Sequence, residues 1–385
     1  MKSIAVVSVA RSDYGILTPV MRGISEHPDL ALQLVVAGMH LDEAQGRTID
    51  QIRRDGWTIA ETVEMTPASD SGRAVADAIG RGIAGFARAF QRFSPDLVVL
   101  LGDRFETLAA ATAALPLRLP VAHIHGGEAT FGALDDAFRH AITKMSHLHF
   151  AATREYAQRI IQMGEEEWRV TVSGAPGLDN IADTPFLSLK ELAEHLCIPL
   201  PSPPVLVTFH PETAGETAAE QQLDALLGAL SEVALPVVFT AANSDAGGRY
   251  IAARIDQFVR QSPASYFAAS LGTQAYFSLL KHAAVMVGNS SSGIIEAPSF
   301  GLPVVNIGTR QEGRVRASNV IDVGHKRREI ADAIRQAVSP GFSEALEGLS
   351  NPYGEGNAAP VIVDRLAEVS LGHRLLMKRF IDTER

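Results

Sequence analysis

The stretch "HIHGGEAT" at residues 123–130 brings together two histidines, two glycines and a glutamate behind the apolar run "LPVA". These residue types could support two kinds of chemistry. His123 and His125, two positions apart on a strand, would point to one face and could ligate a metal together with Asp103. Alternatively, Glu128 could act in a group of carboxylates. Either histidine could also be a buried strand-end residue with no chemical role.

The carboxylates form the second candidate constellation. Asp103 follows an apolar run in "LLGDRFET", and Asp135 and Asp136 follow Glu128 in "HGGEATFGALDD". Crowded carboxylates raise one another's pKa values, which prepares one as an acid and another as a base. A structural alternative for Asp103 is the N-cap of the next helix, with Glu106 completing a capping box.

The histidines are unevenly distributed, since five of the 12 lie between residues 123 and 149. Within that region, "RHAITKMSHLHF" (139–150) is typical of a helix that runs into a strand. Its side chains Arg139, His140 and Lys144 are available to hold anions. This clustering favours a functional site over isolated structural histidines.

The segment "VGNSSSGIIEAPSFGLPV" (287–304) has the pattern of a strand, a Ser/Gly loop, a helix and a second strand. Such a turn presents backbone N–H groups to an anion, and the helix dipole adds to their attraction. Ser290, Ser291 and Ser292 would add hydroxyl donors, while Glu296 could accept from sugar hydroxyls. A serine N-cap without a ligand is the alternative. The segment matches neither a P-loop nor a dinucleotide-binding motif.

Other charged residues stand at further predicted strand ends. His210, in "LVTFHPET", follows a strand in the second half of the chain. Arg11 follows the first strand, and Arg104 lies beside Asp103. Arg310 and Arg314 in "GTRQEGR" are further candidates for binding phosphate, although they could equally be solvated loop residues.

Apolar runs alternate along the chain with longer, alanine-rich amphipathic stretches. The runs are continuous rather than alternating, which indicates strands buried on both faces of a parallel sheet with helices on either side. In the first half we predict strands at Ile4–Val9, Ala31–Ala37, Leu97–Leu101, Val121–His125 and His149–Ala151, with helices at Asp70–Arg92 and Phe105–Leu115. In the second half we predict strands at Val205–Phe209, Pro236–Thr240, Ala284–Gly288 and Val304–Ile307.

This pattern restarts after Thr184–Pro204, a segment with five prolines that is typical of a linker. We therefore predict two doubly wound α/β domains, residues 1–185 and 186–360, rather than a (β/α)8 barrel. Residues 361–385 continue a helical pattern that spans Ala358–Ile381 and could pack on either domain. Ligands of doubly wound sheets bind beyond the carboxyl ends of the strands, where the polar segments above stand. A cleft between the two domains is the expected site.

Composition narrows the functional class. The chain has 385 residues and a net charge of −10, which argues against a general nucleic-acid binder. The lone cysteine, Cys197, excludes an internal disulfide and fits a reducing compartment. Ile4–Val9 suits a buried strand better than a signal-peptide core, and no run approaches the roughly 18 apolar residues of a membrane span. We expect a cytoplasmic protein without membrane contact.

The set "RSDYG", "GDRFE", "HIHGGE…DD…RHAITKMSHLHF", "HPET" and "GNSSSGIIEAPSFGLPVVNIGTRQEGR" closely resembles the hydrolysing UDP-N-acetylglucosamine 2-epimerases of sialic-acid and legionaminic-acid synthesis. These motifs run in order from about residue 8 to residue 323. The resemblance implies a GT-B fold, in which two Rossmann-like domains flank a nucleotide-sugar cleft and the C-terminal helix often crosses back to the first domain. It also implies a homodimer, with no metal and no nicotinamide cofactor.

The family reaction eliminates UDP across C-1 and C-2 of the sugar, and water then adds to the resulting 2-acetamidoglycal with inversion at C-2. By matching motifs, Asp103 and Asp135 correspond to the family's catalytic acids, and His210 to a catalytic or phosphate-contacting histidine. The resemblance assigns UDP binding to Arg11, Ser290, Ser291, Glu296 and Arg310. The residue types suit this chemistry, because carboxylates can move the protons while cations and N–H groups stabilise the leaving diphosphate.

One position departs from many members of the family. They have glutamate as the third residue of the first motif ("HIE"), where this chain has His125. We hypothesise that Glu128 supplies the missing carboxylate and that His125 assists it.

Three other functions remain open at this point. A retaining GT-B glycosyltransferase would need an acceptor, a metallohydrolase built on His123, His125 and Asp103 would lose activity with EDTA, and a nucleotide-sugar sensor would not turn over. For an epimerase, UDP-N-acetylglucosamine, UDP-N,N′-diacetylbacillosamine and a GDP-linked analogue are all suitable substrates.

Overall fold

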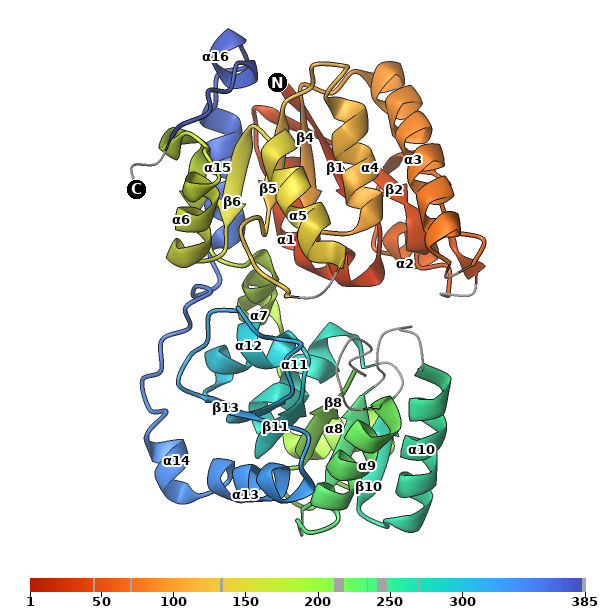
Figure 1. Ribbon diagram of the computed structural model, residues 1–385, viewed down its shortest axis with the longest axis vertical. Helices are drawn as coiled ribbons and strands as arrows, with labels where there is room; N and C mark the ends of the chain where they lie inside the picture. The colour runs from red at the N-terminus through yellow and green to blue at the C-terminus, as the bar shows by residue number, and fades with distance from the viewer. Residues whose placement is uncertain are drawn as a thin grey trace. The chain divides into compact units, whose positions relative to one another are not determined.

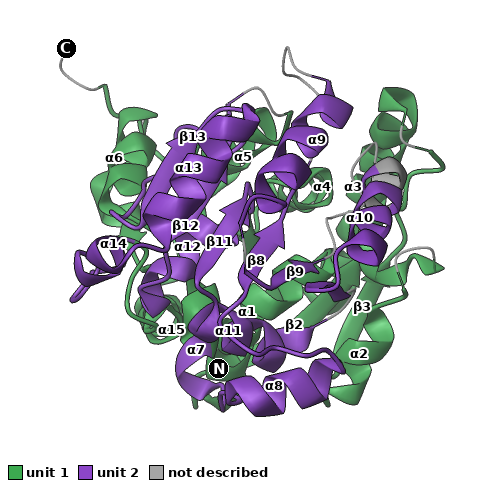
Figure 2. Ribbon diagram, turned by 90° about the horizontal axis from the view of Figure 1, so that it is seen from below, with its two compact units in different colours: residues 1–129, 133–180, 353–385 green, residues 130–132, 181–352 purple. Residues whose placement is uncertain are grey.

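The computed structural model describes residues 1–43, 46–69, 71–131, 134–210, 218–233, 235–240, 248–268 and 271–382. The chain divides into two compact units, which Figure 2 colours separately. Unit 1 comprises Met1–Ala129, Ala133–Asn180 and Tyr353–Arg385, and unit 2 comprises Thr130–Gly132 and Ile181–Pro352. The sequence pattern had placed the corresponding divisions after residues 185 and 360.

Unit 1 is built on a parallel sheet of seven strands in the order β3-β2-β1-β4-β5-β6-β7. The order reverses between β1 and β4, which is where ligands bind in doubly wound folds. The strands are β1 (Lys2–Ser8), β2 (Leu30–Ala37), β3 (Ile59–Val63), β4 (Leu97–Leu101), β5 (Val121–Ile124), β6 (Leu148–Ala151) and β7 (Val170–Val172).

Helices cover both faces of this sheet (Figure 1). Successive residues of β1 serve opposite faces, since Ile4 and Val6 pack in one apolar core while Ala5 and Val7 pack in the other. The first core also takes α1 (Arg11–Glu26), α2 (Ile49–Arg54) and α15 (Ala358–Glu368), and the second takes α3 (Gly72–Phe93), α4 (Phe105–Ala114) and α5 (Leu134–Met145). The remaining α-helices of this unit are α6 (Arg154–Gln162) and α16 (His373–Leu376). Helix α7 (Asp179–Asp183) spans the boundary between the units that follows Asn180.

Unit 2 repeats the plan with a parallel sheet of six strands in the order β10-β9-β8-β11-β12-β13. Its strands are β8 (Val205–Thr208), β9 (Val237–Thr240), β10 (Ser265–Ala268), β11 (Val285–Gly288), β12 (Val304–Ile307) and β13 (Val320–Val323). Its helices are α8 (Leu189–Leu196), α9 (Ala219–Leu230), α10 (Gly248–Gln261), α11 (Gly272–His282), α12 (Ser292–Ile295), α13 (Arg327–Ala337) and α14 (Pro340–Glu344). Two apolar cores again lie on the two faces, so the predicted pair of doubly wound α/β folds is confirmed.

The predicted strands are all present, with ends shifted by one residue at most except at the start of β1, which begins two residues earlier than predicted. Four further strands, β3, β7, β10 and β13, were not predicted, and each lies at an edge of its sheet. The predicted helix at Asp70–Arg92 is α3, which begins at Gly72, while Asp70 itself lies outside the described residues. Across the described ranges, none of the helices combines the length and the apolar character that a membrane span requires.

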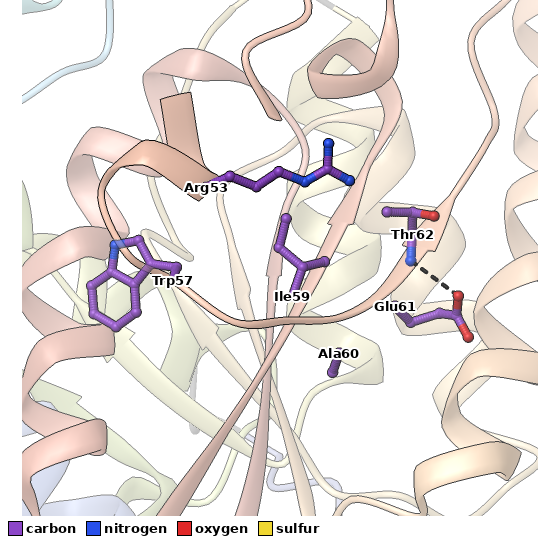
Figure 3. A pocket seen from close by; sticks show the side chains of 6 residues that line it. All are labelled: Arg53, Trp57, Ile59, Ala60, Glu61 and Thr62. Carbon is purple, nitrogen blue, oxygen red and sulfur yellow. Dashed lines mark hydrogen bonds between the residues drawn. The ribbon is translucent and has the colours of Figure 1, made fainter. Parts of the chain in front are cut away.

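A cavity of about 300 Å³ lies beside the edge strand β3, lined by Arg53, Trp57 and residues 59–62 (Figure 3). Within it, the side chain of Glu61 accepts a hydrogen bond from the backbone N–H of Thr62. None of the candidate site residues lines this cavity. This cavity is therefore separate from the candidate residues at the carboxyl ends of the strands.

The C-terminal segment packs on unit 1, but not as the single helix predicted for Ala358–Ile381. Helix α15 ends at Glu368, where the backbone turns extended at Val369, and only the short α16 follows. The end of α15 is bound by Lys2, whose ammonium donates to the carbonyls of Leu366 and Val369. Farther along, the buried guanidinium of Arg169 donates to the backbone oxygens of Arg374, Leu375 and Met377 at 2.8–3.2 Å. These carbonyls bind a side chain instead of continuing a helix.

We predict that replacing Arg169 with Met, which keeps an apolar stem, destabilises unit 1 by roughly 3 kcal/mol or more. The substitution leaves several buried carbonyl oxygens without donors, among them that of His147. Urea denaturation followed by circular dichroism measures the change. The matched control is Arg328→Met, because the side chain of Arg328 is 95% exposed and should contribute almost nothing. Equal losses in the two variants would contradict the anchoring role of Arg169.

Candidate active site

The polar segments that follow β1, β4 and β5 stand at one edge of the unit 1 sheet, because these strands are parallel neighbours. Arg11 opens α1 three residues beyond the end of β1 and is exposed. Asp103 and Arg104 lie just past the end of β4, and His125 directly follows β5. The topology therefore brings these predicted side chains to the same edge of the sheet.

Asp103 accepts a charge-assisted hydrogen bond from Arg139, a buried residue of α5. The same guanidinium lies 3.7 Å from the carboxylate of Asp136. The capping-box alternative does not form, because Arg104 occupies the N-cap of α4 and Glu106 pairs with Arg104 at 3.2 Å. Asp103 thus binds Arg139 at the sheet edge and does not cap the helix α4.

Asp135 lies in the first turn of α5, near the charges of Asp103 and Arg139. Desolvation raises the pKa of Asp135, and the neighbouring charge of Asp103 raises it further. Arg104 and Arg139 act in the opposite direction but do not cancel the effect. A carboxyl with a raised pKa next to one that is bound by an arginine is the arrangement that acid/base chemistry requires.

His125 and Glu128 are in direct contact, through Nδ1 of the imidazole and a carboxylate oxygen. Both residues are buried, and the backbone N–H of His125 donates to the carbonyl of Phe150 at 3.1 Å. His125 adopts a left-handed backbone conformation, with φ of 63°. The pair can act as one proton-transfer unit, since a carboxylate on one ring nitrogen fixes the orientation of the imidazole.

The two glycines of "HIHGG" serve packing within unit 1. A Cβ on Gly127 would lie 2.4 Å from the backbone oxygen of Tyr156, and one on Gly126 would lie 2.9 Å from Nδ1 of His123. Gly127 also has a φ of 76°, which a side chain disfavours. The two glycines therefore accommodate the ring of His123 and helix α6.

His123 is fully buried, and protein groups engage both its ring nitrogens. Nε2 contacts the carbonyl of Gly102 at 2.7 Å, and Nδ1 contacts the hydroxyl of Thr143 at 3.2 Å. Burial lowers the pKa of His123 to about 3, so the ring is neutral. With both nitrogens occupied, His123 cannot serve as the metal ligand considered from the sequence. No metal-binding group of three or more His, Cys, Asp or Glu side chains exists among the residues that the structure describes.

Two acidic residues at this edge were not identified from the sequence. Asp13, in the first turn of α1, is nearly buried, and desolvation raises its pKa to about 7. The charge of Arg104 opposes this shift, and that of Glu106 adds to it. Glu106 is itself buried and lies so close to Gly38 that a Cβ there would be 2.9 Å from its carboxylate. The motif "RSDYG" does not distinguish Asp13, because a first-turn aspartate is also an ordinary helix-start residue.

In unit 2 the predicted residues gather at the ends of β8, β11 and β12. His210 follows β8 and is buried, with both its backbone groups bonded to the side chain of Asn289 at 2.8 Å. Arg310, beyond β12, donates to the backbone carbonyl of Asn289 at 3.0 Å. The three strand ends are therefore connected through Asn289.

The helix that follows the serine loop is shorter than the sequence suggests. The helix expected after it consists of the single turn α12 followed by a 3-10 turn at Ala297–Phe300, with Glu296 between them. The N–H of Ser292 donates to Ser290 Oγ at 3.3 Å, and the hydroxyl of Tyr276 donates to Ser292 Oγ at 2.6 Å. A single turn has a small dipole, so the loop's capacity for anions rests on hydroxyls and nearby cations such as Arg310.

Two basic residues of "RHAITKMSHLHF", Lys144 and His140, have other roles. Lys144 donates to the buried carboxylate of Glu165 at 2.5 Å and to the carbonyl of Met163 at 3.0 Å. His140 lies 3.5 Å from Asp136. Lys144 therefore stabilises the interior of unit 1 and is not available to hold a substrate anion.

Comparison with known proteins agrees with this arrangement. A family model described as UDP-N-acetylglucosamine 2-epimerase matches residues 22–367. The chain belongs to this family. It is 36% identical to the UDP-N,N′-diacetylbacillosamine 2-epimerase (hydrolyzing) of Legionella pneumophila, over 98% of this chain and 99% of that one. It is 34% identical to a UDP-N-acetylglucosamine 2-epimerase of Neisseria meningitidis serogroup B, over 99% of each chain.

The family fold extends to solved structures. The UDP-GlcNAc 2-epimerase of Methanocaldococcus jannaschii, solved with UDP-GlcNAc and UDP, superposes with a TM-score of 0.78 at 17% identity, covering 94% of this chain and 99% of that one. Members of the family share the GT-B arrangement of two parallel-sheet α/β domains, which confirms the fold predicted from the motifs. Within the epimerase fold of this chain, unit 1 carries Arg11, Asp103, Arg104, His125, Glu128 and Asp135, and unit 2 carries His210, Ser290, Ser291, Ser292, Glu296 and Arg310.

The raised pKa of Asp13 predicts a specific pH dependence of stability. The folded protein holds the Asp13 proton up to about pH 7, whereas the unfolded chain releases it near pH 4. Stability is thus lost as the pH rises from 4 to 7. We expect Asp13→Asn, which mimics the protonated form, to gain about 2 kcal/mol or more over the wild type at pH 8 and little at pH 4.

Thermal unfolding across pH 4–8 measures this difference. The control is Asp77→Asn, because that carboxyl is 63% exposed and its replacement should shift stability equally at every pH. A gain for Asp13→Asn that does not change with pH would contradict the assignment.

Proposed function

We propose that this protein is a hydrolysing 2-epimerase that converts a UDP-linked 2-acetamido sugar to the free mannose-configured sugar and UDP. The observation that carries the proposal is the carboxylate and arginine group at the edge of the unit 1 sheet. There Arg139 holds Asp103, Asp135 has a raised pKa, and Glu128 contacts His125. Membership of the 2-epimerase family and 36% identity to a hydrolysing relative support it.

The first step needs a base and a stabilised leaving group. Glu128, with His125, takes the proton from C-2 of the sugar. The electron pair of the C–H bond forms the C-1–C-2 double bond, and the C-1–O bond breaks to release UDP with its electrons. The arginines Arg11 and Arg310 and the serines of the 290–292 loop neutralise the charge that develops on the diphosphate. The product is a 2-acetamidoglycal.

The second step adds water to that glycal. The hydroxyl joins C-1, and C-2 receives a proton from the face opposite to the one that lost it, which inverts the configuration. A carboxylic acid that keeps its proton near neutral pH is required, and the raised pKa of Asp135 suits it for this role. Asp103, held by Arg139, is suited to stabilise positive charge on the sugar ring. His210 contacts the phosphates or moves a proton to them.

Two sugars are candidates for the substrate. UDP-N-acetylglucosamine is the substrate suggested by the motifs and by the name of the Neisseria relative. UDP-N,N′-diacetylbacillosamine is favoured by the name of the Legionella relative, which has slightly higher identity over almost its full length. We propose UDP-N-acetylglucosamine as the main substrate and the diacetylated sugar as the alternative.

The test is to incubate the purified, EDTA-treated protein with each nucleotide sugar in heavy water. We expect UDP release without any acceptor, together with a free sugar that carries deuterium at C-2 and the manno configuration. NMR identifies the sugar and the deuterium. A requirement for an acceptor would indicate a glycosyltransferase, and activity that returns only on adding a divalent metal would indicate a metallohydrolase; either result refutes the proposal.

Glu128→Gln isolates the proposed base. The amide keeps the shape of the side chain but cannot accept a proton, so UDP release should fall by roughly 10²–10⁴-fold. The control is Glu329→Gln on α13, since the side chain of Glu329 is 46% exposed and pairs with Lys326 at 2.9 Å. Turnover of Glu128→Gln near that of the control would assign the proton transfer to His125 alone.

We further propose, from the family resemblance, that the protein acts as a homodimer in the cytoplasm. Light scattering on the purified full chain tests the first part of this proposal, and a mass of one chain would refute it.

A further inference from the structure

The side chain of Asn289 is bonded to both backbone groups of His210. Its Nδ2 donates to the carbonyl of His210, and the N–H of His210 donates to its Oδ1, each at 2.8 Å. Because a carbonyl can only accept and an N–H can only donate, these partners define the orientation of the amide. Asn289 is 1% exposed and His210 is 5% exposed, so water cannot easily replace these bonds.

The pair continues the sheet beyond its last regular residues. Strands β8 and β11 are paired up to Thr208 and Gly288, and the N–H of Asn289 then donates to the carbonyl of Thr208 at 3.2 Å. Gly288 makes this approach possible, since a Cβ there would lie 1.9 Å from the oxygen of Thr208. The Asn289 side chain thereby takes the place of a neighbouring strand for His210.

A third strand end is attached through the backbone of the same residue. The carbonyl of Asn289 accepts from Nη1 of Arg310 at 3.0 Å and from Nε2 of Gln311 at 2.8 Å. Gln311 is 2% exposed. Asn289 therefore links the end of β8, the serine loop and the segment after β12. Its side chain bonds to His210, whereas its backbone carbonyl bonds to Arg310 and Gln311.

We propose that Asn289 is the positioning residue for His210, holding the backbone of that residue so that its imidazole is presented to the substrate in one orientation. The inference rests on the function proposed above for His210. Positioning of this kind affects the reaction rate, because a shift of about 1 Å in a reacting group can cost roughly 10²-fold in rate. Asn289 does not touch the substrate in this proposal, and it acts only through His210.

A double-mutant cycle tests the coupling. The kcat/KM for UDP release is measured for the wild type, Asn289→Ala, His210→Ala and the double variant. We expect Asn289→Ala to lose roughly 30- to 100-fold, almost entirely in kcat, because the contacts of Arg310 and Gln311 use the retained backbone carbonyl. In the His210→Ala background the same change should cost less than about 3-fold. Equal losses in both backgrounds would refute the inference.

Asn319→Ala is the matched control. Asn319 is fully buried, and its amide donates to the carbonyl of Leu302 at 2.8 Å, before β12 begins and so at the opposite edge of the sheet. Its replacement should reduce stability as Asn289→Ala does while leaving kcat within about 3-fold of the wild type. If Asn319→Ala lowers kcat as much as Asn289→Ala, the loss reflects destabilisation in general, and the positioning role is refuted.

A second measurement does not depend on turnover. In protein labelled with 13C-histidine, the His210 signal is assigned by its absence in His210→Gln. We expect Asn289→Ala to shift or broaden that signal and its pH titration, with the other histidine signals unchanged. An unaltered His210 signal would refute the inference. If the wild type releases UDP from neither nucleotide sugar, the proposed function fails, while the NMR result still decides whether Asn289 positions His210.

Discussion

The structure depends on one constraint, which is that both sheets consist entirely of parallel strands. A parallel strand needs helices on both faces, and every strand must then end at the same edge of its sheet. In unit 1 this brings the segments after β1, β4 and β5 together, although Arg11 and Asp135 are far apart along the chain. The polar residues at these ends are not needed for the apolar cores, so they are available for chemistry.

Electrostatics then divides the carboxylates at that edge into different roles. Asp103 is held by a buried arginine, whereas desolvation raises the pKa values of Asp13 and Asp135. Arg104 contacts Glu106 and so places another positive charge in the group. Burial favours the protonated forms of Asp13 and Asp135, whereas Arg104 opposes this shift for both residues and Arg139 opposes it for Asp135. The same cluster can therefore present both a base and an acid.

The sequence predicts the central strands well and the edge strands poorly, for a physical reason. Strands such as β4 and β5 are buried on both faces, so their residues form continuous apolar runs. An edge strand such as β3 ("IAETV") or β13 ("VIDV") is partly exposed and carries polar residues, so it lacks that signal. The C-terminal segment shows another limit, since the helical pattern continues past Glu368, whereas the backbone turns extended there and Arg169 binds the carbonyl of Arg374 farther along. That contact joins residues some two hundred positions apart and has no local signature.

The candidate site shows the same distinction between local and tertiary information. The residue types and their positions at strand ends could be read from the motifs, but the pairing of His123 and His125 on one face could not. That expectation assumed that the strand continues through His125, whereas β5 ends at Ile124 and His125 has a positive φ. Once the alternation of the strand stops, the two imidazoles serve different partners: His123 joins the core through Thr143 and Gly102, while His125 contacts Glu128. A single change of backbone conformation thus separates a structural histidine from one that is placed to assist a carboxylate, and it does so at the residue where this chain departs from the glutamate common in the family.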